Sequence, residues 1–328
     1  MRRRGFIHGI AACAAWPLAA RAQSREQKRR VAVLMGGLLP DDSGGRAEVA
    51  AFEAGLAELG WKLGSNIELI YRWPGAELDQ VSIAANEIAA MRPDLVVSRS
   101  TPTTAIMMNR GPPLVFVLVT DPLGSGFVRN LGKPGGSVTG FSLFEGSVGG
   151  KWLALLKEAG PSISKVSLLF NPETAPFAEN YRRSAEAAAP TLGVTVVPAP
   201  CGNKAHIESA IAARASEGGG GVIGIPDTFI NEHRDFIIEL TAHQRLPAVY
   251  GNRNFVQRGG LLAYSVDFAA IFHRAAGYVD QTLRGVRPGE LPVQAPDTFI
   301  LSVNLKTAGA MGLSLPQNLI ARADEVIE

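Results

Sequence analysis

Short polar side chains directly follow most apolar segments of this chain, and one of them, Asp121, is a carboxylate next to a proline. The apolar run 113–117 leads into Leu118-Val119-Thr120-Asp121-Pro122. Proline disfavours the helical conformation for the residue before it, so the Asp121 carboxylate is predicted to point off a strand end, into a cleft or onto a neighbouring turn. It could receive an ammonium group or cap the following turn. The sequence leaves both roles open.

The same pattern recurs after other apolar segments in both halves of the chain. Examples are Ser100-Thr101-Pro102, Asn171-Pro172-Glu173-Thr174, Pro226-Asp227-Thr228 and Gly251-Asn252. Ser, Thr, Asn and Asp are good helix N-caps, so each has a structural explanation by itself. If the turns of both halves converge on one cleft, they form a shell of short polar groups that suits a small molecule.

Motifs for catalysis and for cofactors are missing from the chain. Gly36-Gly37-Leu38-Leu39 does not have the spacing of a dinucleotide-binding loop, and Gly149-Gly150-Lys151-Trp152 lacks the upstream glycine and the Ser/Thr of a P-loop. There is no G-x-S-x-G nucleophile motif. The histidines show no metal spacing, and Cys201 has no local His or Cys partner. We therefore expect no catalytic residue, cofactor or metal.

The elements that must position these turns alternate along the chain. From Arg30 onward, short runs rich in β-branched residues alternate with longer segments of helical period, which predicts parallel sheets covered by helices on both faces. About five strands are expected in each half, which is the size of one doubly wound sheet. The predicted fold is therefore α/β, with two doubly wound parallel-sheet lobes.

Two glycine- and proline-rich segments divide these lobes. The chain loosens within 140–151 and again within 288–296, and a last predicted strand, 298–303, follows the second segment. We predict that residues 23–140 and 297–328 form lobe 1 and that residues 141–296 form lobe 2, including the crossing segments. Lobes joined by short linkers can rotate as rigid bodies and close on a ligand.

The N-terminus has the pattern of an export signal. Arg2-Arg3-Arg4 precede a modest apolar region, and Ala20-Arg21-Ala22 offers a cleavage site, so residues 1–22 are predicted to be a signal peptide of the Sec or twin-arginine type. A lipid anchor at Cys13 is the minor alternative. Cleavage removes four arginines and no acid, which leaves 28 basic against 30 acidic residues. Without a basic excess, nucleic acid is not an expected partner.

Several longer segments resemble the extracytoplasmic substrate-binding proteins of ABC transporters, in the group that includes the tryptophan/tyrosine-type binding proteins. The similarity extends over 30–328, and the segments that carry it are VLVTDPLGSGF (117–127), GGSVTGFS (135–142), LLFNPET (168–174), PVQAP (292–296), VNLK (303–306) and LIARADEVIE (319–328). The chain departs from the aromatic amino-acid binders in the glycine-rich loop 40–45 and at Thr103-Thr104. These departures leave the identity of the ligand open.

The resemblance implies a type I periplasmic-binding-protein fold, no catalysis, no cofactor, and delivery of a small solute to a membrane permease from the periplasm, by a monomer or, alternatively, a dimer. The ligand contacts that it implies are Thr101, Pro102, Thr103, Thr104, Thr120, Asp121, Asn171, Glu173, Thr174, Asp227, Thr228, Tyr250 and Asn252. Within this set, Asp121 and Asp227 are the candidates for binding an amino group. Backbone N–H groups of 101–104 and 173–174 are the candidates for a carboxylate.

Two other functions remain open for a chain of this type. A periplasmic sensing protein would use the same fold to report a ligand to a membrane kinase. An exported α/β enzyme would turn its solute over, although the missing motifs speak against it.

Overall fold

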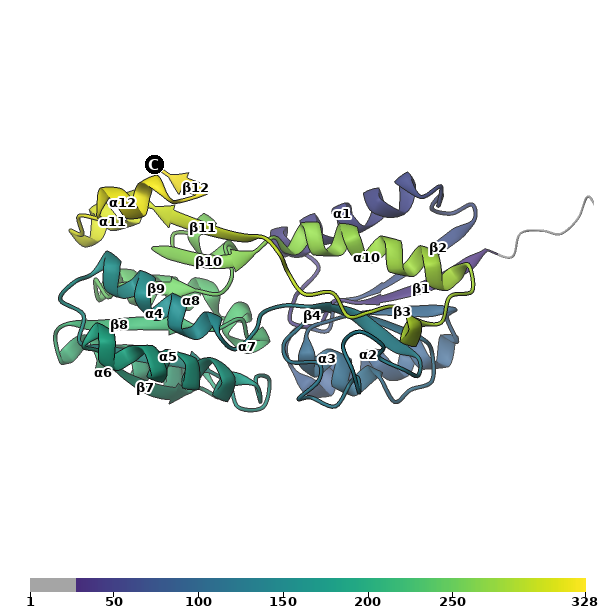
Figure 1. Ribbon diagram of the computed structural model, residues 1–328, viewed down its shortest axis with the longest axis horizontal. Coiled ribbons are helices and arrows are strands. Elements are labelled where there is room, and N and C mark those ends of the chain that lie inside the picture. Colours follow the sequence, from purple (N-terminus) through teal and green to yellow (C-terminus); the bar gives the residue numbers. More distant parts are fainter. Residues whose placement is uncertain (1–27) are drawn as a thin grey trace, which may run out of the picture.

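Two β-sheets, each in its own lobe, organise the chain (Figure 1). The computed structural model describes residues 28–328. The predicted signal peptide, residues 1–22, and the alternative anchor at Cys13 lie outside the described residues. No helix in the described part of the chain is long and apolar enough to cross a membrane.

Lobe 1 contains a five-stranded parallel sheet in the order β2-β1-β3-β4-β5. Its strands are β1 (Arg29–Leu34), β2 (Ile67–Arg72), β3 (Leu95–Arg99), β4 (Leu114–Val119) and β5 (Val138–Ser142). Strands β3 and β4 are buried along their whole length, as expected for a sheet covered on both faces. The covering helices are α1 (Ser43–Glu58), α2 (Leu78–Met91), α3 (Thr101–Met107) and α10 (Phe268–Leu283).

Lobe 2 contains a seven-stranded sheet in the order β12-β11-β10-β9-β8-β6-β7. Its strands are β6 (Lys165–Phe170), β7 (Thr195–Pro200), β8 (Gly220–Gly224), β9 (Ala248–Tyr250), β10 (Leu262–Val266), β11 (Phe299–Asn304) and β12 (Glu325–Ile327). All neighbours are parallel except β10 and β11. The helices of this lobe are α4 (Val148–Ala159), α5 (Ala178–Leu192), α6 (Lys204–Ser216), α7 (Thr228–Glu232), α8 (Arg234–His243), α9 (Asn254–Gln257), α11 (Leu305–Met311) and α12 (Gln317–Ala321).

The C-terminal segment belongs to lobe 2, so the prediction that 297–328 completes lobe 1 is wrong. Strand β11 pairs antiparallel with β10, and β12 pairs with β11. The last segment thus extends the sheet of lobe 2 at its edge. The sequence pattern identifies a strand in this region, but strand pairing over a long separation leaves no mark in the local pattern.

Helix α10 makes the opposite exchange and packs on lobe 1. Figure 1 shows α10 beside α1 over the first sheet. The rings of Phe52 and Phe272 meet edge to face at 6.5 Å, and the Trp61 indole N–H donates to Asp280 Oδ1 at 2.9 Å. This helix lies within 141–296, all of which is predicted to form lobe 2, and that part of the prediction is also wrong.

Three segments therefore cross between the lobes. They are the connection from β5 to α4, the step from β10 into α10 at Asp267, and the return from the 3₁₀ turn Pro288–Glu290 to β11. An aromatic cluster joins these segments on the side of lobe 2: the ring of Phe144 lies 5.6 Å from that of Trp152, and Tyr264 stacks on Phe299 at 5.4 Å. The cluster fixes one end of each crossing segment, which leaves the crossings themselves as the hinge.

Candidate ligand-binding site

Residues that follow strands of the first sheet meet residues of lobe 2 across one cleft. Asp42, which lies after β1, pairs with Arg234 at the start of α8, at 2.6 Å. On the other side of the cleft, the Thr120 hydroxyl after β4 lies 3.2 Å from the hydroxyl of Tyr181 on α5. The two lobes are thus in direct contact at two places across the cleft.

A cavity of about 530 Å³ lies between the two lobes. This volume is within the range of small-molecule sites. From lobe 1 it is lined by Leu78, Thr101, Pro102, Ala105, Ile106, Asp121, Gly124, Ser125 and Phe127, and from lobe 2 by Glu173, Pro176, Phe177, Glu179, Asn180 and Arg183. We call it the main cavity. It combines aromatic and aliphatic walls with charges of both signs.

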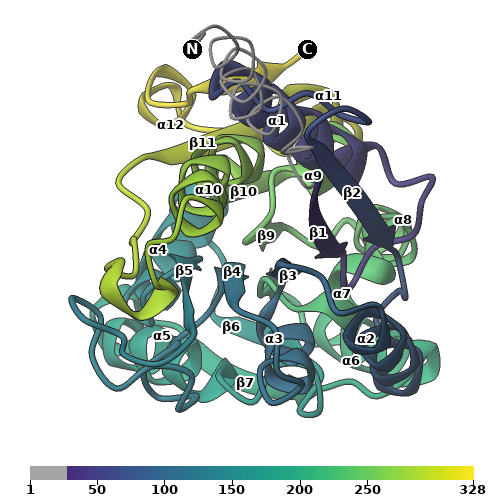
Figure 2. The same cartoon turned by 90° about the vertical axis from the view of Figure 1, so that its right-hand side faces the viewer.

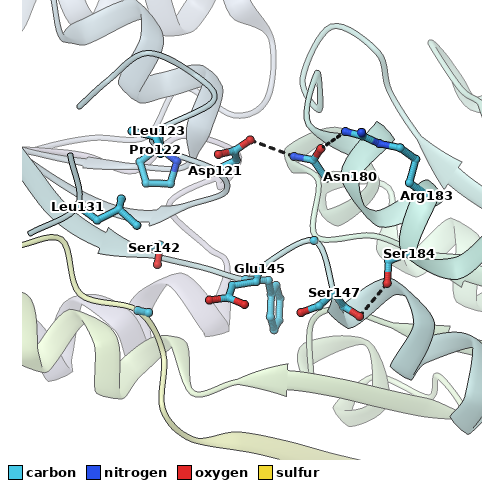
Figure 3. A pocket seen from close by; sticks show the side chains of 13 residues that line it. Asp121, Pro122, Leu123, Leu131, Ser142, Glu145, Ser147, Asn180, Arg183 and Ser184 are labelled. Carbon is cyan, nitrogen blue, oxygen red and sulfur yellow. Dashed lines mark hydrogen bonds between the residues drawn. The ribbon is translucent and has the colours of Figure 1, made fainter. Parts of the chain in front are cut away.

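A second cavity of about 510 Å³ lies next to it on the hinge side (Figure 3). Its apolar lining comes from Leu123, Leu131 and Phe144, and its acidic residue at the hinge is Glu145. Asp121, Asn180 and Arg183 line both cavities and therefore separate them.

Asp121 has the turn-capping role that the sequence left open, and its second oxygen reaches the other lobe. Its Oδ1 accepts from the Gly124 N–H at 2.8 Å, which closes the turn after β4. Its Oδ2 accepts from Asn180 Nδ2 at 3.0 Å, and Asn180 Oδ1 accepts from Arg183 at 2.8 Å (Figure 3). The carboxylate also lines the main cavity, so capping does not prevent it from meeting a ligand.

The backbone beside the main cavity holds unusual conformations. Ser100, Leu118 and Asp121 have φ angles of 79°, 59° and 48°, in the left-handed region that side chains other than glycine rarely adopt. The pairing of β4 with β5 shifts register between Val117 and Val119, which turns the strand end away from the regular sheet. Such residues persist where the surrounding structure holds them, and they gather at ligand sites.

Asp227 differs from the expectation that it receives an amino group from the ligand. It is buried, and protein donors occupy both its oxygens: the Asn171 N–H at 2.7 Å, the Thr174 hydroxyl at 2.5 Å and the Phe229 N–H at 3.1 Å. Burial raises the pKa of this carboxyl to about 6, although the three hydrogen bonds oppose the shift. Asp227 thus joins the turns after β6 and β8, and it is not part of the lining of the main cavity.

The threonine-rich turn after β3 divides between the cavity and the protein interior. Thr101 and Pro102 line the main cavity, and Thr101 Oγ1 also accepts from the Thr120 N–H at 2.9 Å. The Thr103 hydroxyl pairs with that of Ser100 at 2.9 Å, and the Thr104 hydroxyl pairs inside lobe 1 with that of Ser98 at 2.7 Å. Of the four predicted residues in this turn, two face the cavity and two support it.

Two predicted residues of lobe 2 serve other contacts. Tyr250 is buried in the core, where its ring stacks on Phe255 at 4.2 Å and its hydroxyl pairs with Thr241. Asn252 accepts from the Asn254 N–H at 3.0 Å and donates to Asn231. Tyr250 points into the core because it faces the buried side of β9, which the sequence could not specify.

The remaining predicted residues of lobe 2 lie at the cleft in different ways. Glu173 lines the main cavity, and its N–H is occupied by Asn171 Oδ1 at 2.8 Å. Thr228 is buried against Gly37 of lobe 1. A Cβ added at Gly37 would lie 2.6 Å from the methyl group of Thr228. Within residues 28–328, the Thr228 hydroxyl has no hydrogen-bond partner.

Sequence reasoning missed the residues that α3, α5 and the loop after Asp121 add to the main cavity. Phe127, Phe177, Asn180 and Arg183 all line it, and none of them directly follows a strand. A usable signal exists for three of them. The first turns of α5 come directly after the polar turn 171–174, so their exposed side chains must emerge near the same sheet edge.

The groups that could support redox or metal chemistry lie apart from the cavity. In the part of the chain that the structure covers, no set of three His, Cys, Asp or Glu side chains could hold a metal ion. Cys201 is buried, and burial raises the pKa of its thiol to about 11, which keeps it in the unreactive protonated form at neutral pH.

Comparison with known proteins gives one consistent result. A family model described as ABC transporter substrate binding protein matches residues 41–327. The tyrosine-binding protein of Clostridioides difficile (strain R20291) is 23% identical over 268 residues, which are 80% of this chain and 75% of that protein.

Solved structures agree on the fold. A conserved domain protein from Vibrio cholerae is 25% identical with a TM-score of 0.82, over 92% of this chain and all of that one. An ABC domain in complex with L-Trp from Streptococcus pneumonia is 22% identical, also with a TM-score of 0.82, over 92% of this chain and 100% of that chain. The two-lobed arrangement described above is therefore shared with known binding proteins.

Proposed function

This chain belongs to the ABC transporter substrate-binding protein family, and from that premise we propose that it binds an amino acid or a similar small aromatic or amide-like solute in the main cavity. Members of this family are extracytoplasmic and bind small molecules for ABC permeases. We propose the same role for this chain. The predicted signal peptide directs its export to the periplasm, where the protein captures the solute and delivers it to the permease.

The observation that carries the proposal is the composition of the main cavity, to which both lobes contribute. Asp121 and Glu173 supply carboxylates, Glu179 is already paired with Arg182, and Arg183 is the one cationic side chain that the described residues contribute to the lining. A solute with an ammonium group meets complementary charge there. Phe127 and Phe177 offer aromatic contact for an apolar body. An amphipathic solute of amino-acid size satisfies both features.

A carboxylate on the same solute would need donors from the opposite side. Arg183 is one candidate. The N–H groups of Thr101 and Thr103 are the others, because they donate to no acceptor within residues 28–328. The N–H of Glu173, in contrast, is already used by Asn171. The set of groups proposed to bind the solute carboxylate is therefore smaller than the set predicted from the sequence, which included the N–H groups of 101–104 and 173–174.

Binding without turnover distinguishes this function from an exported enzyme. We propose that the cleft returns its solute unchanged, since the structure brings no activated nucleophile and no metal-binding group to the cavity among the described residues. The proposed partners are the solute and the permease subunits.

A thermal-shift screen tests the proposal. The purified protein is heated with each of the standard amino acids, with aromatic acids and with their amides, and hits are measured by calorimetry. A ligand that binds only the native state stabilises it and therefore raises the melting temperature. At a ligand concentration of one hundred times the Kd, the free energy of unfolding increases by about 3 kcal/mol. Recovery of the unchanged solute after incubation excludes turnover. The screen also includes sugars and polyols, and a result in which only these bind would contradict the proposal.

A further inference from the structure

The rim of the cleft that lies away from the hinge is closed by an ion pair between the lobes. Asp42 and Arg234 approach to 2.6 Å, with side-chain exposures of 7% and 15%. In Figure 2, which looks along the long axis, α7 and α8 of lobe 2 and β1 and β2 of lobe 1 appear on the same side of the molecule, whereas β5 and α4, which flank one hinge crossing, appear on the other. A contact on the side opposite this crossing resists separation of the lobes.

Other contacts on the same rim require the lobes to be close together. Glu232 Oε2 accepts from the Ala76 N–H across the cleft at 3.2 Å. Gly37, with φ of 78°, packs closely against Thr228. A Cβ added at Gly37 would lie 2.6 Å from the Thr228 methyl group. The ion pair thus belongs to a fitted interface between the lobes and is not an isolated surface contact.

Lobe 1 holds Asp42 in the orientation that the pair needs. Asp42 Oδ1 accepts from the Gly45 N–H at 2.8 Å as the N-cap of α1, which leaves Oδ2 for Arg234. Behind this loop, Arg99 forms a buried ion pair with Glu48 and donates to the Gly36 carbonyl at 3.0 Å. The loop from Gly36 to Asp42 is therefore fixed at both ends, so little side-chain entropy is lost when Arg234 arrives.

Neither member of the pair lines the main cavity, and both line a smaller cavity of about 230 Å³ at the rim itself, so a solute in the main cavity does not interrupt their attraction. We infer that Asp42 and Arg234 are positioning residues, which bias the solute-free protein toward the closed arrangement and thereby set its affinity. The apparent affinity for a solute is reduced by the fraction of the protein that is not in the binding-competent state. A protein that is already largely closed therefore binds more tightly than one that must first close. This inference concerns closure alone and stands whichever solute the cavity takes.

Two variants separate the ion pair from the helix cap. Asp42→Asn keeps a good N-cap for α1 and removes the charge, while Arg234→Ala removes the partner. The chain offers a matched control for each. Asp41→Asn changes the exposed neighbouring acid, and Arg322→Ala removes an arginine that pairs with Glu158 at the surface of lobe 2, outside the network of Arg234.

Small-angle X-ray scattering of the solute-free protein provides the test. Asp42→Asn and Arg234→Ala are each expected to increase the radius of gyration, with the closed-to-open ratio falling about tenfold, as is typical of coupling between two states. The double variant is expected to match the single ones, because the two residues act as a pair. Both control variants should scatter like the wild type, and the melting temperature of Asp42→Asn should stay close to that of Asp41→Asn.

An unchanged radius of gyration in both Asp42→Asn and Arg234→Ala would overturn the inference. A matching increase in Asp41→Asn and Arg322→Ala would do the same, since it would show a general charge effect. Calorimetry with L-tyrosine forms a second arm, in which Asp42→Asn is expected to weaken binding about tenfold. If L-tyrosine does not bind, this arm uses the best solute from the thermal-shift screen, and the scattering result decides the inference in either case.

Discussion

Asp121 and Asp227 have similar sequence contexts in the two lobes and do different things. Each follows a strand of its sheet, and each lies next to a proline. Asp227 is buried, with three protein donors on its two oxygens, whereas Asp121 is half-buried, with one oxygen on its own turn and the other on Asn180 of the opposite lobe. One carboxylate holds a lobe together, and the other lies where the lobes meet.

The comparison teaches that the position after a strand does not determine whether a carboxylate is available to a ligand. A carboxylate is available to a ligand when few protein donors contact its oxygens and when solvent can still reach it. A buried carboxylate needs its hydrogen bonds to offset the loss of hydration, so they cannot be given up for a ligand. A carboxylate at a cleft can exchange its partner for a ligand at small cost.

The largest effect is expected for Asp227→Ala. The substitution leaves the Asn171 and Phe229 N–H groups and the Thr174 hydroxyl without their acceptor in a buried place. We expect the free energy of unfolding to fall by about 3 to 5 kcal/mol, measured by urea denaturation. As a control, Thr174→Val removes one of the three donors together with its need for a partner, and should cost about 1 kcal/mol.

A loss below about 1 kcal/mol for Asp227→Ala would mean that water replaces the carboxylate. Asp227 would then be accessible to a ligand after all, and the contrast with Asp121 would disappear.

The pH dependence of stability sharpens the same contrast. The folded pKa of Asp227 is raised to about 6, and the ordinary value of an unfolded Asp is about 3.9. The folded state therefore binds the proton more tightly, so this contribution to stability is fully present below about pH 4 and is lost as the pH rises through 6. From this residue we expect a decrease in unfolding free energy of about 2 to 3 kcal/mol between pH 4 and pH 7.

Denaturation curves across this pH range, compared with those of Asp227→Asn, isolate the contribution. The variant cannot titrate at this position, so the difference between the two proteins should change with pH by the amount given above. Parallel curves would show that Asp227 has an ordinary pKa in the folded protein.

A smaller effect is expected for Asp121, and it should affect binding more than folding. If its charge receives the solute's ammonium group, Asp121→Ala should weaken binding of the best solute from the screen by about 1 to 2 kcal/mol, or roughly five- to thirtyfold, by calorimetry. Loss of the hydrogen bond from Gly124 should cost no more than about 1 kcal/mol of stability, because the turn is open to solvent.

Asp121→Asn distinguishes the two roles of this residue. It keeps an acceptor for the Gly124 N–H and removes the charge. Affinity reduced as much as in the alanine variant would establish contact with the ammonium group, while affinity equal to the wild type would leave Asp121 with turn capping and the Asn180 contact alone.

Much of the fold could be predicted because its signals are local. Runs of β-branched residues mark most of the strands, and one short apolar run, Lys165–Phe170, forms β6. Helix α1 follows from the spacing of Phe52 and Leu56, both of which are buried. The sheet to which β11 belongs could not be predicted, because antiparallel pairing with β10 depends on where two distant segments meet.

The candidate site was predictable to a smaller extent. Thr101, Pro102, Asp121 and Glu173 line the main cavity, as expected for residues after strands. Asp227 and Tyr250 have the same sequence context but face the interior, where Thr174 and Thr241 bind them. Asn180 and Arg183 reach the cavity from a helix, and a search restricted to strand ends does not find them.

The sequence by itself determined the alternation of strands and helices, the polar turns between them and the membership of a binding-protein family. Each of these depends on residues close together in the chain or on motifs that can be read in order. The tertiary structure decided which turns face the cleft, which lobe owns the last strand and α10, and that Asp42 meets Arg234 across the rim. Those outcomes depend on desolvation and on contacts between segments far apart in the chain, which acquire their energies only when the lobes are assembled.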